Sequence, residues 1–142
     1  MPRPLRAGKK ALVVRNGYFS YRWTDIFEQT GVASEVVVLK AELDGAADAA
    51  RPHVRPQSVA DIVAAITREK PAVVFAPHVE TSTGVMLPDS ELRAVAAAAH
   101  SVGALFVLDC VASGTAWVDM RATGVDVIIS APQKGWSGQG LT

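Results

Sequence analysis

The sequence is poor in cysteine, in aromatic residues and in long apolar runs, and each shortage excludes a class of protein. Cys110 is the single cysteine among 142 residues, so no disulfide can form within the chain, which suits a reducing cytoplasm. No apolar run approaches the roughly 20 residues that a membrane-spanning helix needs. The basic N-terminus is not followed by the apolar region of a signal peptide. We therefore expect a cytoplasmic protein with no membrane partner.

Charge of one sign is also missing, because Lys and Arg number 14 and Asp and Glu number 14, giving a formal net charge of zero. Without a basic stripe or an Arg-rich run, nucleic acid is not expected as a partner. Apolar residues make up 49% and aromatic residues only 6% of the chain. The sequence therefore predicts one domain whose core consists mainly of Ala, Val, Ile and Leu.

Short apolar runs alternate with segments of helical spacing. Strands are predicted at 11–15, 35–39, 72–77, 104–109 and 125–130, and helices at 21–29, 59–69 and 88–102. The segment 40–56, rich in Ala, Asp and Pro, is predicted to be a loop, and no hairpin signal stands out. This alternation predicts an α/β fold with three layers, a mostly parallel sheet with helices on both faces.

In such sheets, ligands bind beyond the carboxyl ends of the strands. Four segments follow predicted strands: 16–19, 78–84, 109–113 and 131–138. They supply an aromatic cluster, a hydroxyl-rich turn, one carboxylate and one lysine. We therefore expect the functional site where these segments meet.

Asp109 and Lys134 are the charged groups that stand out in these segments. A carboxylate directly after an apolar strand is costly unless a cation or a strong donor meets it. Lys134 could be partly desolvated, which would favour a nucleophilic amine. The residues alone leave two interpretations open: an ion pair at the edge of the sheet, or a Schiff-base lysine with a partner carboxylate.

The segment VLDCVASGTAWVDMRATGVDVIISAPQKGWSG resembles the core of the class V aminotransferases, and HVETSTGVMLP and RNGYFSYRW resemble two turns of the same family. The resemblance is greatest to the alanine–glyoxylate and serine–glyoxylate aminotransferase group. It runs from about residue 8 to the end of the chain. It implies the pyridoxal-phosphate-dependent fold type I and pyridoxal 5'-phosphate as cofactor.

The resemblance implies a catalytic role for Lys134 and Asp109. Lys134 would hold the cofactor as a Schiff base and move the proton at the substrate Cα. Asp109 would pair with the ring nitrogen and keep it protonated, so that the ring accepts electrons when the Cα–H bond breaks.

Four more residues would bind the cofactor if the resemblance holds. Val111 would pack on one face of the ring and Phe19 on the other. Thr81 would hydrogen-bond near the phenolic oxygen, and Gln133 would reach the phosphate. Plain core packing remains open for Phe19, and a turn-capping role remains open for Thr81.

Other reactive side chains receive a structural interpretation. His53, His78 and His100 match no metal-ligand spacing, so no metal is expected. Cys110 follows Asp109 on a strand whose side chains alternate, which predicts a small core residue. Tyr18, Tyr21 and Trp23 are likewise interpreted as core residues.

The activity implied by the resemblance is transamination between a small amino acid, alanine-like or serine-like, and a 2-oxo acid such as glyoxylate or pyruvate, in a homodimeric parent protein. Two alternatives stay open. One is another class V pyridoxal-phosphate enzyme, namely a lyase, a desulfurase or a kynureninase-like enzyme. The other is a non-catalytic α/β fragment or binding module.

The chain departs from the family pattern in its extent. Residues 1–142 resemble a partial cofactor-binding large domain that lacks the N-terminal phosphate-binding turn and the C-terminal small domain. A sheet without its outer neighbours leaves backbone groups unpaired. We therefore expect the isolated chain to be poorly stable or inactive, although its parent would be a transaminase.

Overall fold

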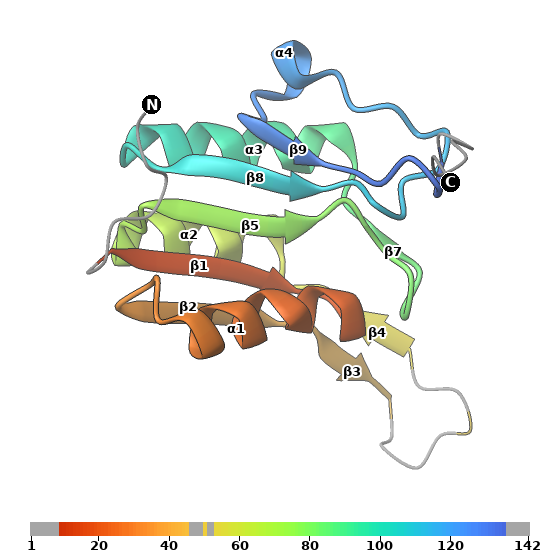
Figure 1. Ribbon diagram of the computed structural model, residues 1–142, viewed down its shortest axis with the longest axis horizontal. Helices are drawn as coiled ribbons and strands as arrows, with labels where there is room; N and C mark the ends of the chain where they lie inside the picture. The colour runs from red at the N-terminus through yellow and green to blue at the C-terminus, as the bar shows by residue number, and fades with distance from the viewer. Residues whose placement is uncertain (1–8, 46–49, 51–52, 136–142) are drawn as a thin grey trace.

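A five-stranded parallel sheet forms the centre of the protein in this computed structural model, which describes residues 9–45, 50 and 53–135 (Figure 1). The strand order is β2-β1-β5-β8-β9, and each neighbouring pair is parallel. The strands are β1 Lys10–Arg15, β2 Glu35–Lys40, β5 Val73–Pro77, β8 Leu105–Asp109 and β9 Val127–Ile129. The five predicted strands and the parallel sheet are confirmed.

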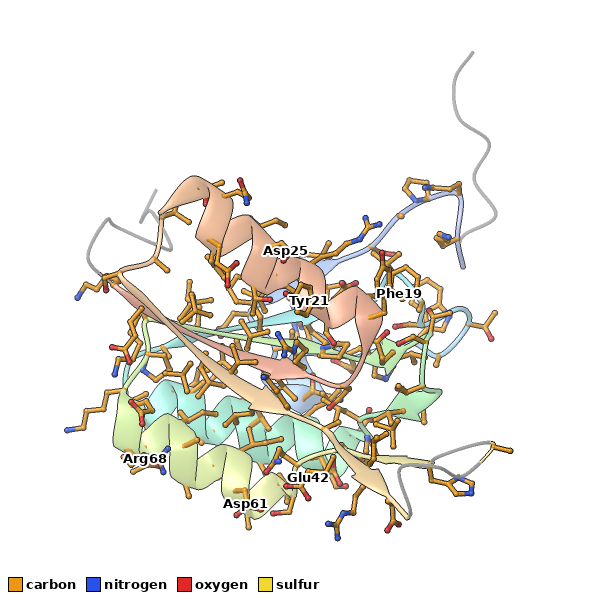
Figure 2. The ribbon with its side chains drawn as sticks, turned by 90° about the horizontal axis from the view of Figure 1, so that it is seen from below. Phe19, Tyr21, Asp25, Glu42, Asp61 and Arg68 are labelled. Atoms are coloured by element: carbon orange, nitrogen blue, oxygen red, sulfur yellow. The ribbon has the colours of Figure 1, made fainter. Side chains whose placement is uncertain are left out.

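Helices cover both faces of the sheet, as predicted. Helix α1 (Tyr18–Thr30) lies on one face, and helices α2 (Val59–Glu69) and α3 (Asp89–Ser101) lie together on the other. Figure 2 shows Asp25 of α1 and Asp61 of α2 on opposite sides of the sheet. The three-layer arrangement predicted from the sequence is therefore confirmed.

Strand alternation explains why both faces are apolar. Leu12 and Val14 of β1 face the core beneath α2 and α3, whereas Ala11 and Val13 face the core beneath α1. Successive side chains of a strand point to opposite faces, so a strand buried on both sides becomes a continuous apolar run. The runs that predicted the strands therefore also predicted the two helical layers.

The core under α1 is small and aromatic. The Trp23 ring stacks on Phe75, with centroids 4.6 Å apart and planes inclined by 28°. Phe27 meets the same Phe75 ring edge-on at 5.4 Å. These contacts fix the roll of α1 on the sheet and so the direction in which its first turn faces.

Two of the predicted helix boundaries are confirmed. The Ser58 hydroxyl accepts the backbone N–H of Asp61 at 3.1 Å and caps the start of α2. Gly31 ends α1 with a φ of 61° and donates its N–H to Phe27. Helix α2 instead ends at Lys70, which adopts the same left-handed region with a φ of 46°.

Two small antiparallel hairpins correct the sequence prediction. Strands β3 (Glu42–Asp44) and β4 (His53–Arg55) pair within the segment predicted to be a loop. Strands β6 (Val79–Glu80) and β7 (Val85–Met86) pair within the hydroxyl-rich turn. Strands of two or three residues are too short to show a period, so the sequence did not reveal them.

A short helix, α4 (Met120–Thr123), was also not predicted. The Asp119 carboxylate caps it by accepting the N–H groups of Arg121 and Ala122. Nothing in the described part of the chain forms a helix both long and apolar enough to cross a membrane.

Candidate functional site

A cleft of about 780 Å³ lies at the carboxyl ends of the strands, where the sequence predicted the site. Its volume lies within the usual range for small-molecule sites, about 300–1,000 Å³. The residues that line it include Phe19, Trp23, Thr81, Asp109, Val111 and Lys134. We call this space the strand-end cleft.

Five of the six residues predicted to bind a cofactor line this cleft: Lys134, Asp109, Val111, Thr81 and Phe19. They come from four separate segments of the chain, up to 115 residues apart (134 minus 19). Gln133, predicted to reach a phosphate, is exposed and is not among the residues that line the cleft. Its role stays a prediction without a place in the cleft.

Asp109 is the last residue of β8 and is partly buried. Its Oδ1 accepts the backbone N–H of Val111 at 3.0 Å, which orients the carboxylate as the chain leaves the strand. In the described residues Asp109 forms no ion pair with Lys134, although both line the cleft. The interpretation of the two as an ion pair at the edge of the sheet is therefore wrong.

Lys134 lies in the turn that follows β9, and its N–H donates to Ala131 at 3.1 Å. Its side chain is exposed, so the expected partial desolvation is not seen in the described residues. The next residue, Gly135, passes close to the loop after β8. A Cβ there would lie 2.7 Å from Gly114 Cα, so only glycine permits this approach.

Phe19 lies in the first turn of α1 and is 45% exposed. Tyr18 meets its ring edge-on, with centroids 5.5 Å apart. The core-packing alternative for Phe19 is therefore wrong, and so is the core interpretation of Tyr18 and Tyr21, which are also exposed. Trp23 is half-buried, as a residue between the core and the cleft would be.

Thr81 lies just after a wholly buried carboxylate, Glu80, that the sequence interpretation missed. Glu80 accepts hydrogen bonds from the backbone of Phe19 and Ser20 and from the hydroxyls of Ser20 and Ser82. Burial alone would raise the pKa of Glu80, but the donors of Ser20, Ser82 and Phe19 outweigh it and lower the pKa. The carboxylate is therefore ionised at neutral pH.

A signal for Glu80 was present in the sequence. Helix α1 begins after Gly17, which has no side chain to cap its free N–H groups, so an acceptor must come from elsewhere. The sequence does not say which residue supplies that acceptor, because Glu80 reaches the helix only in the folded chain.

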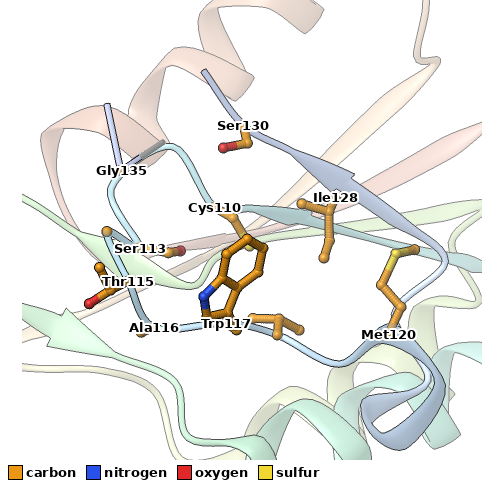
Figure 3. A pocket seen from close by; sticks show the side chains of 11 residues that line it. Cys110, Ser113, Thr115, Ala116, Trp117, Met120, Ile128, Ser130 and Gly135 are labelled. Atoms are coloured by element: carbon orange, nitrogen blue, oxygen red, sulfur yellow. The ribbon is translucent and has the colours of Figure 1, made fainter. Parts of the chain in front are cut away.

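A second, smaller cavity of about 290 Å³ lies beside the cleft (Figure 3). Cys110 and Ser113 line it together with Trp117 and Met120. Cys110 is buried, as predicted, and burial raises the pKa of its thiol. Because Cys110 does not line the strand-end cleft, it has no contact with the space between Asp109 and Lys134.

The histidines lie outside the cleft. His78 is buried, its Nδ1 lies 2.7 Å from Ser113 Oγ, and burial lowers its pKa while the charge of Asp89 acts in the opposite direction. His100 Nε2 lies 2.9 Å from Asp126 on the surface, and His53 belongs to β4. No group of three or more His, Cys, Asp or Glu side chains in residues 9–45, 50 and 53–135 is arranged to hold a metal ion.

Comparison with known proteins points to one family. The family model described as aminotransferase class-V matches residues 1–142. The chain is 31% identical over 132 residues to L-aspartate–glyoxylate aminotransferase of Paracoccus denitrificans, covering 93% of the chain and 31% of that protein. It is 36% identical over 134 residues to serine–glyoxylate aminotransferase of Hyphomicrobium methylovorum, covering 93% of the chain and 30% of that protein.

A solved structure of another glyoxylate aminotransferase has a similar fold. The crystal structure of ureidoglycine–glyoxylate aminotransferase from Bacillus subtilis superposes with a TM-score of 0.72 at 30% identity, covering 91% of this chain and 30% of that one. The chain thus spans about a third of the length of the relatives that it matches.

Proposed function

The chain belongs to the class V aminotransferase family, and from that premise we propose that it carries the cofactor-binding core of a pyridoxal-phosphate-dependent transaminase. The main support for the proposal is that Asp109 and Lys134 both line one cleft and form no ion pair with each other. Asp109 ends β8, Lys134 lies in the turn after the neighbouring strand β9, and both line the same space of about 780 Å³. A carboxylate and an amine that line one cleft without an ion pair are both available to a ligand.

The residues of the cleft fit pyridoxal phosphate, the cofactor of this family. A cationic ring nitrogen needs an anionic partner, and Asp109 is a partly buried carboxylate already oriented by Val111. A flat ring needs apolar walls, and Val111 and the exposed ring of Phe19 both line the cleft. When bound, the cofactor supplies the electron-accepting ring that makes loss of the Cα–H bond feasible.

Each residue then has a task of its own. The Lys134 amine would hold the cofactor covalently and would move the proton at the substrate Cα. Asp109 would keep the ring nitrogen protonated, while Val111 and Phe19 would hold the ring from its two faces. Thr81 would donate a hydrogen bond to the ring oxygen. Gln133, outside the cleft lining, would contact the phosphate only if its turn approached the bound cofactor.

The substrate classes follow from the relatives. Two of them are named for glyoxylate as acceptor, with aspartate or serine as donor. We propose a small alanine-like or serine-like amino acid as donor and glyoxylate or pyruvate as acceptor. The exposed position of Lys134 suits this exchange, since the amine must be reached by each substrate in turn. We also propose that the parent protein is a homodimer and that it lies in the cytoplasm.

The alternative of a desulfurase finds no support within this chain. Such an enzyme needs a cysteine that reaches the substrate, whereas Cys110 is buried and lines the smaller cavity (Figure 3). The alternative of a non-catalytic module predicts that the cleft binds no cofactor, and a direct titration distinguishes it from an enzyme.

The experiment is a titration of the protein with pyridoxal phosphate, followed by absorbance. We expect this chain to give a saturable band at a longer wavelength than that of the free cofactor, and the parent protein to form pyruvate or hydroxypyruvate when alanine or serine is supplied with glyoxylate. A band without amino-group transfer by the parent protein would favour a lyase or another class V reaction. The absence of any saturable band would contradict the proposal.

A further inference from the structure

Glu80 is a buried carboxylate to which the proposed reaction gives no task. It is fully shielded from solvent, and it does not line the strand-end cleft. Both of its sequence neighbours, Val79 and Thr81, do line the cleft. Glu80 therefore points away from the cleft while belonging to the segment that forms one of its walls.

The carboxylate joins that wall to the first turn of α1, which also lines the cleft. Its Oε1 accepts the N–H of Phe19 at 3.2 Å, and its Oε2 accepts the N–H of Ser20 at 2.9 Å. The Ser20 hydroxyl adds a third hydrogen bond at 2.7 Å. Glu80 and these partners are 60 or 61 residues apart in sequence, so the contacts connect two distant segments of the chain.

Ser82 extends the same connection. Its hydroxyl donates to Glu80 Oε1 at 2.7 Å and accepts the N–H of Tyr18 at 2.8 Å. The first three N–H groups of α1 are thus all satisfied by the Glu80–Ser82 segment, and an anion stands at the positive end of the helix dipole. In an ordinary helix the side chain of the N-cap residue satisfies only one of these N–H groups.

Gly17 makes the close approach possible. A Cβ at this position would lie 2.7 Å from Glu80 Cγ and would also collide with the Ser82 hydroxyl. The Asn-Gly pair at the start of α1 therefore serves the docking of Glu80 more than the turn itself.

We propose that Glu80 is a positioning residue, which locks the first turn of α1 to the Val79–Thr81 wall and so sets where Phe19 meets the cofactor. This inference rests on the proposed function, because it concerns the same cleft. Glu80 touches neither cofactor nor substrate and acts through Phe19. A carboxylate is required, since it accepts at both oxygens, whereas the amide of Gln would turn a donor toward one of the N–H groups.

The test compares four variants with the wild-type chain: Glu80→Gln, Phe19→Leu, the double variant, and Glu28→Gln as control. Glu28 is an exposed glutamate of the same helix, so its change removes an equal charge. It leaves intact the hydrogen bonds of Glu80 to Phe19, Ser20 and Ser82, which we call the lock. The first measurement needs no cofactor. Hydrogen exchange of the Phe19 and Ser20 amides should accelerate at least about tenfold in Glu80→Gln and stay unchanged in Glu28→Gln.

The second measurement is the dissociation constant for pyridoxal phosphate. Glu80→Gln and Phe19→Leu should each weaken binding by about tenfold. The double variant should bind within about threefold of Phe19→Leu alone, because Glu80 acts through Phe19. The inference would be overturned if the double variant weakened binding by the product of the two single effects, or if Glu80→Gln left the dissociation constant unchanged.

The two proposals can fail separately. If the wild-type chain shows no saturable band, the proposed function fails, and unchanged amide exchange in Glu80→Gln would show independently that the lock does not exist. Should Glu80→Gln fold poorly, Ser82→Ala removes one donor to Glu80 and the acceptor of the Tyr18 N–H while keeping the carboxylate. It should accelerate amide exchange at Tyr18 and weaken cofactor binding in the same direction, and the absence of both effects would contradict the lock.

Discussion

Asp109, the last residue of β8, and Lys134, in the turn after the neighbouring strand β9, line one cleft and form no ion pair with each other. Opposite charges in a partly enclosed space gain from pairing, so the absence of this ion pair calls for a structural reason. The Val111 N–H takes up one oxygen of Asp109, and Gly135 fixes the turn of Lys134 against Gly114. Each residue is thus placed by backbone contacts of its own segment and not by a contact with the other.

Replacing Asp109 by Asn should weaken cofactor binding while leaving the Lys134-dependent band in place. The amide keeps the shape of the side chain but loses the charge that favours a protonated ring nitrogen. We expect the dissociation constant for pyridoxal phosphate to rise by about tenfold to a hundredfold, the usual worth of a hydrogen bond to a charged group. Asp25→Asn, on the exposed side of α1 (Figure 2), is the matched control and should bind as the wild type does. If Asp109→Asn and Asp25→Asn bound pyridoxal phosphate with equal affinity, Asp109 would not be a cofactor-binding residue.

Gly135→Ala should displace the turn that carries Lys134. The added Cβ would meet the backbone of Gly114, which cannot move aside as a flexible side chain would. We expect a loss of stability of about 1–3 kcal/mol, seen in urea unfolding, and at least about tenfold weaker cofactor binding. Gly31→Ala is the control: it strains the left-handed end of α1 far from the cleft, where no atom lies within 4 Å of the new Cβ. It should lower stability and leave affinity unchanged.

Acid should weaken the lock made by Glu80. Burial alone would raise the pKa of Glu80, but the surrounding donors lower it below its ordinary value of 4.5. A carboxyl whose pKa is lower in the folded state stabilises the fold above its unfolded pKa and loses that contribution as pH falls through the folded value. The free energy of unfolding of the wild type should therefore be at least about 2 kcal/mol larger than that of Glu80→Gln at pH 7, measured by urea unfolding. That difference should shrink steadily below about pH 4.5, and a constant difference down to pH 3 would show that ionisation is not involved.

Lys70→Gly should stabilise the protein, although it removes a side chain. Lys70 ends α2 with a φ of 46°, and its N–H donates to Ile66 at 2.9 Å. A residue with a Cβ is strained in this left-handed region, and glycine is not. We expect a gain of about 0.5–1 kcal/mol in the free energy of unfolding, after allowing for the greater freedom of glycine in the unfolded chain. A loss of stability would mean that the Lys70 side chain makes a contribution of its own.

The sequence predicted the sheet and its two helical layers because buried parallel strands and amphipathic helices leave long, regular patterns. It also placed Asp109 and Lys134 at neighbouring strand ends, since strand order and the position of ligands in such sheets follow general rules. The side chains of Tyr18 and Tyr21 were placed wrongly in the core. Helical spacing alone does not say which side of α1 meets the sheet, and the Trp23–Phe75 and Phe27–Phe75 contacts decide it.

Glu80 marks the limit of prediction from single segments. Its partners Phe19 and Ser20 lie about 60 residues away, so only the folded chain brings them together. The β3–β4 and β6–β7 hairpins were missed for a related reason, because their pairing depends on where the larger sheet delivers their ends.

The central claim is that Lys134 holds the cofactor covalently, and chemical trapping tests it most directly. Pyridoxal phosphate is added to the protein, the mixture is reduced with borohydride, and the modified lysine is located by mass spectrometry of peptides. Lys134→Ala is compared with Lys40→Ala, which removes an exposed lysine of β2 outside the strand-end cleft. We expect one dominant modification at Lys134, present in Lys40→Ala and absent in Lys134→Ala. Modification spread evenly over the surface lysines, unchanged in Lys134→Ala, would contradict it.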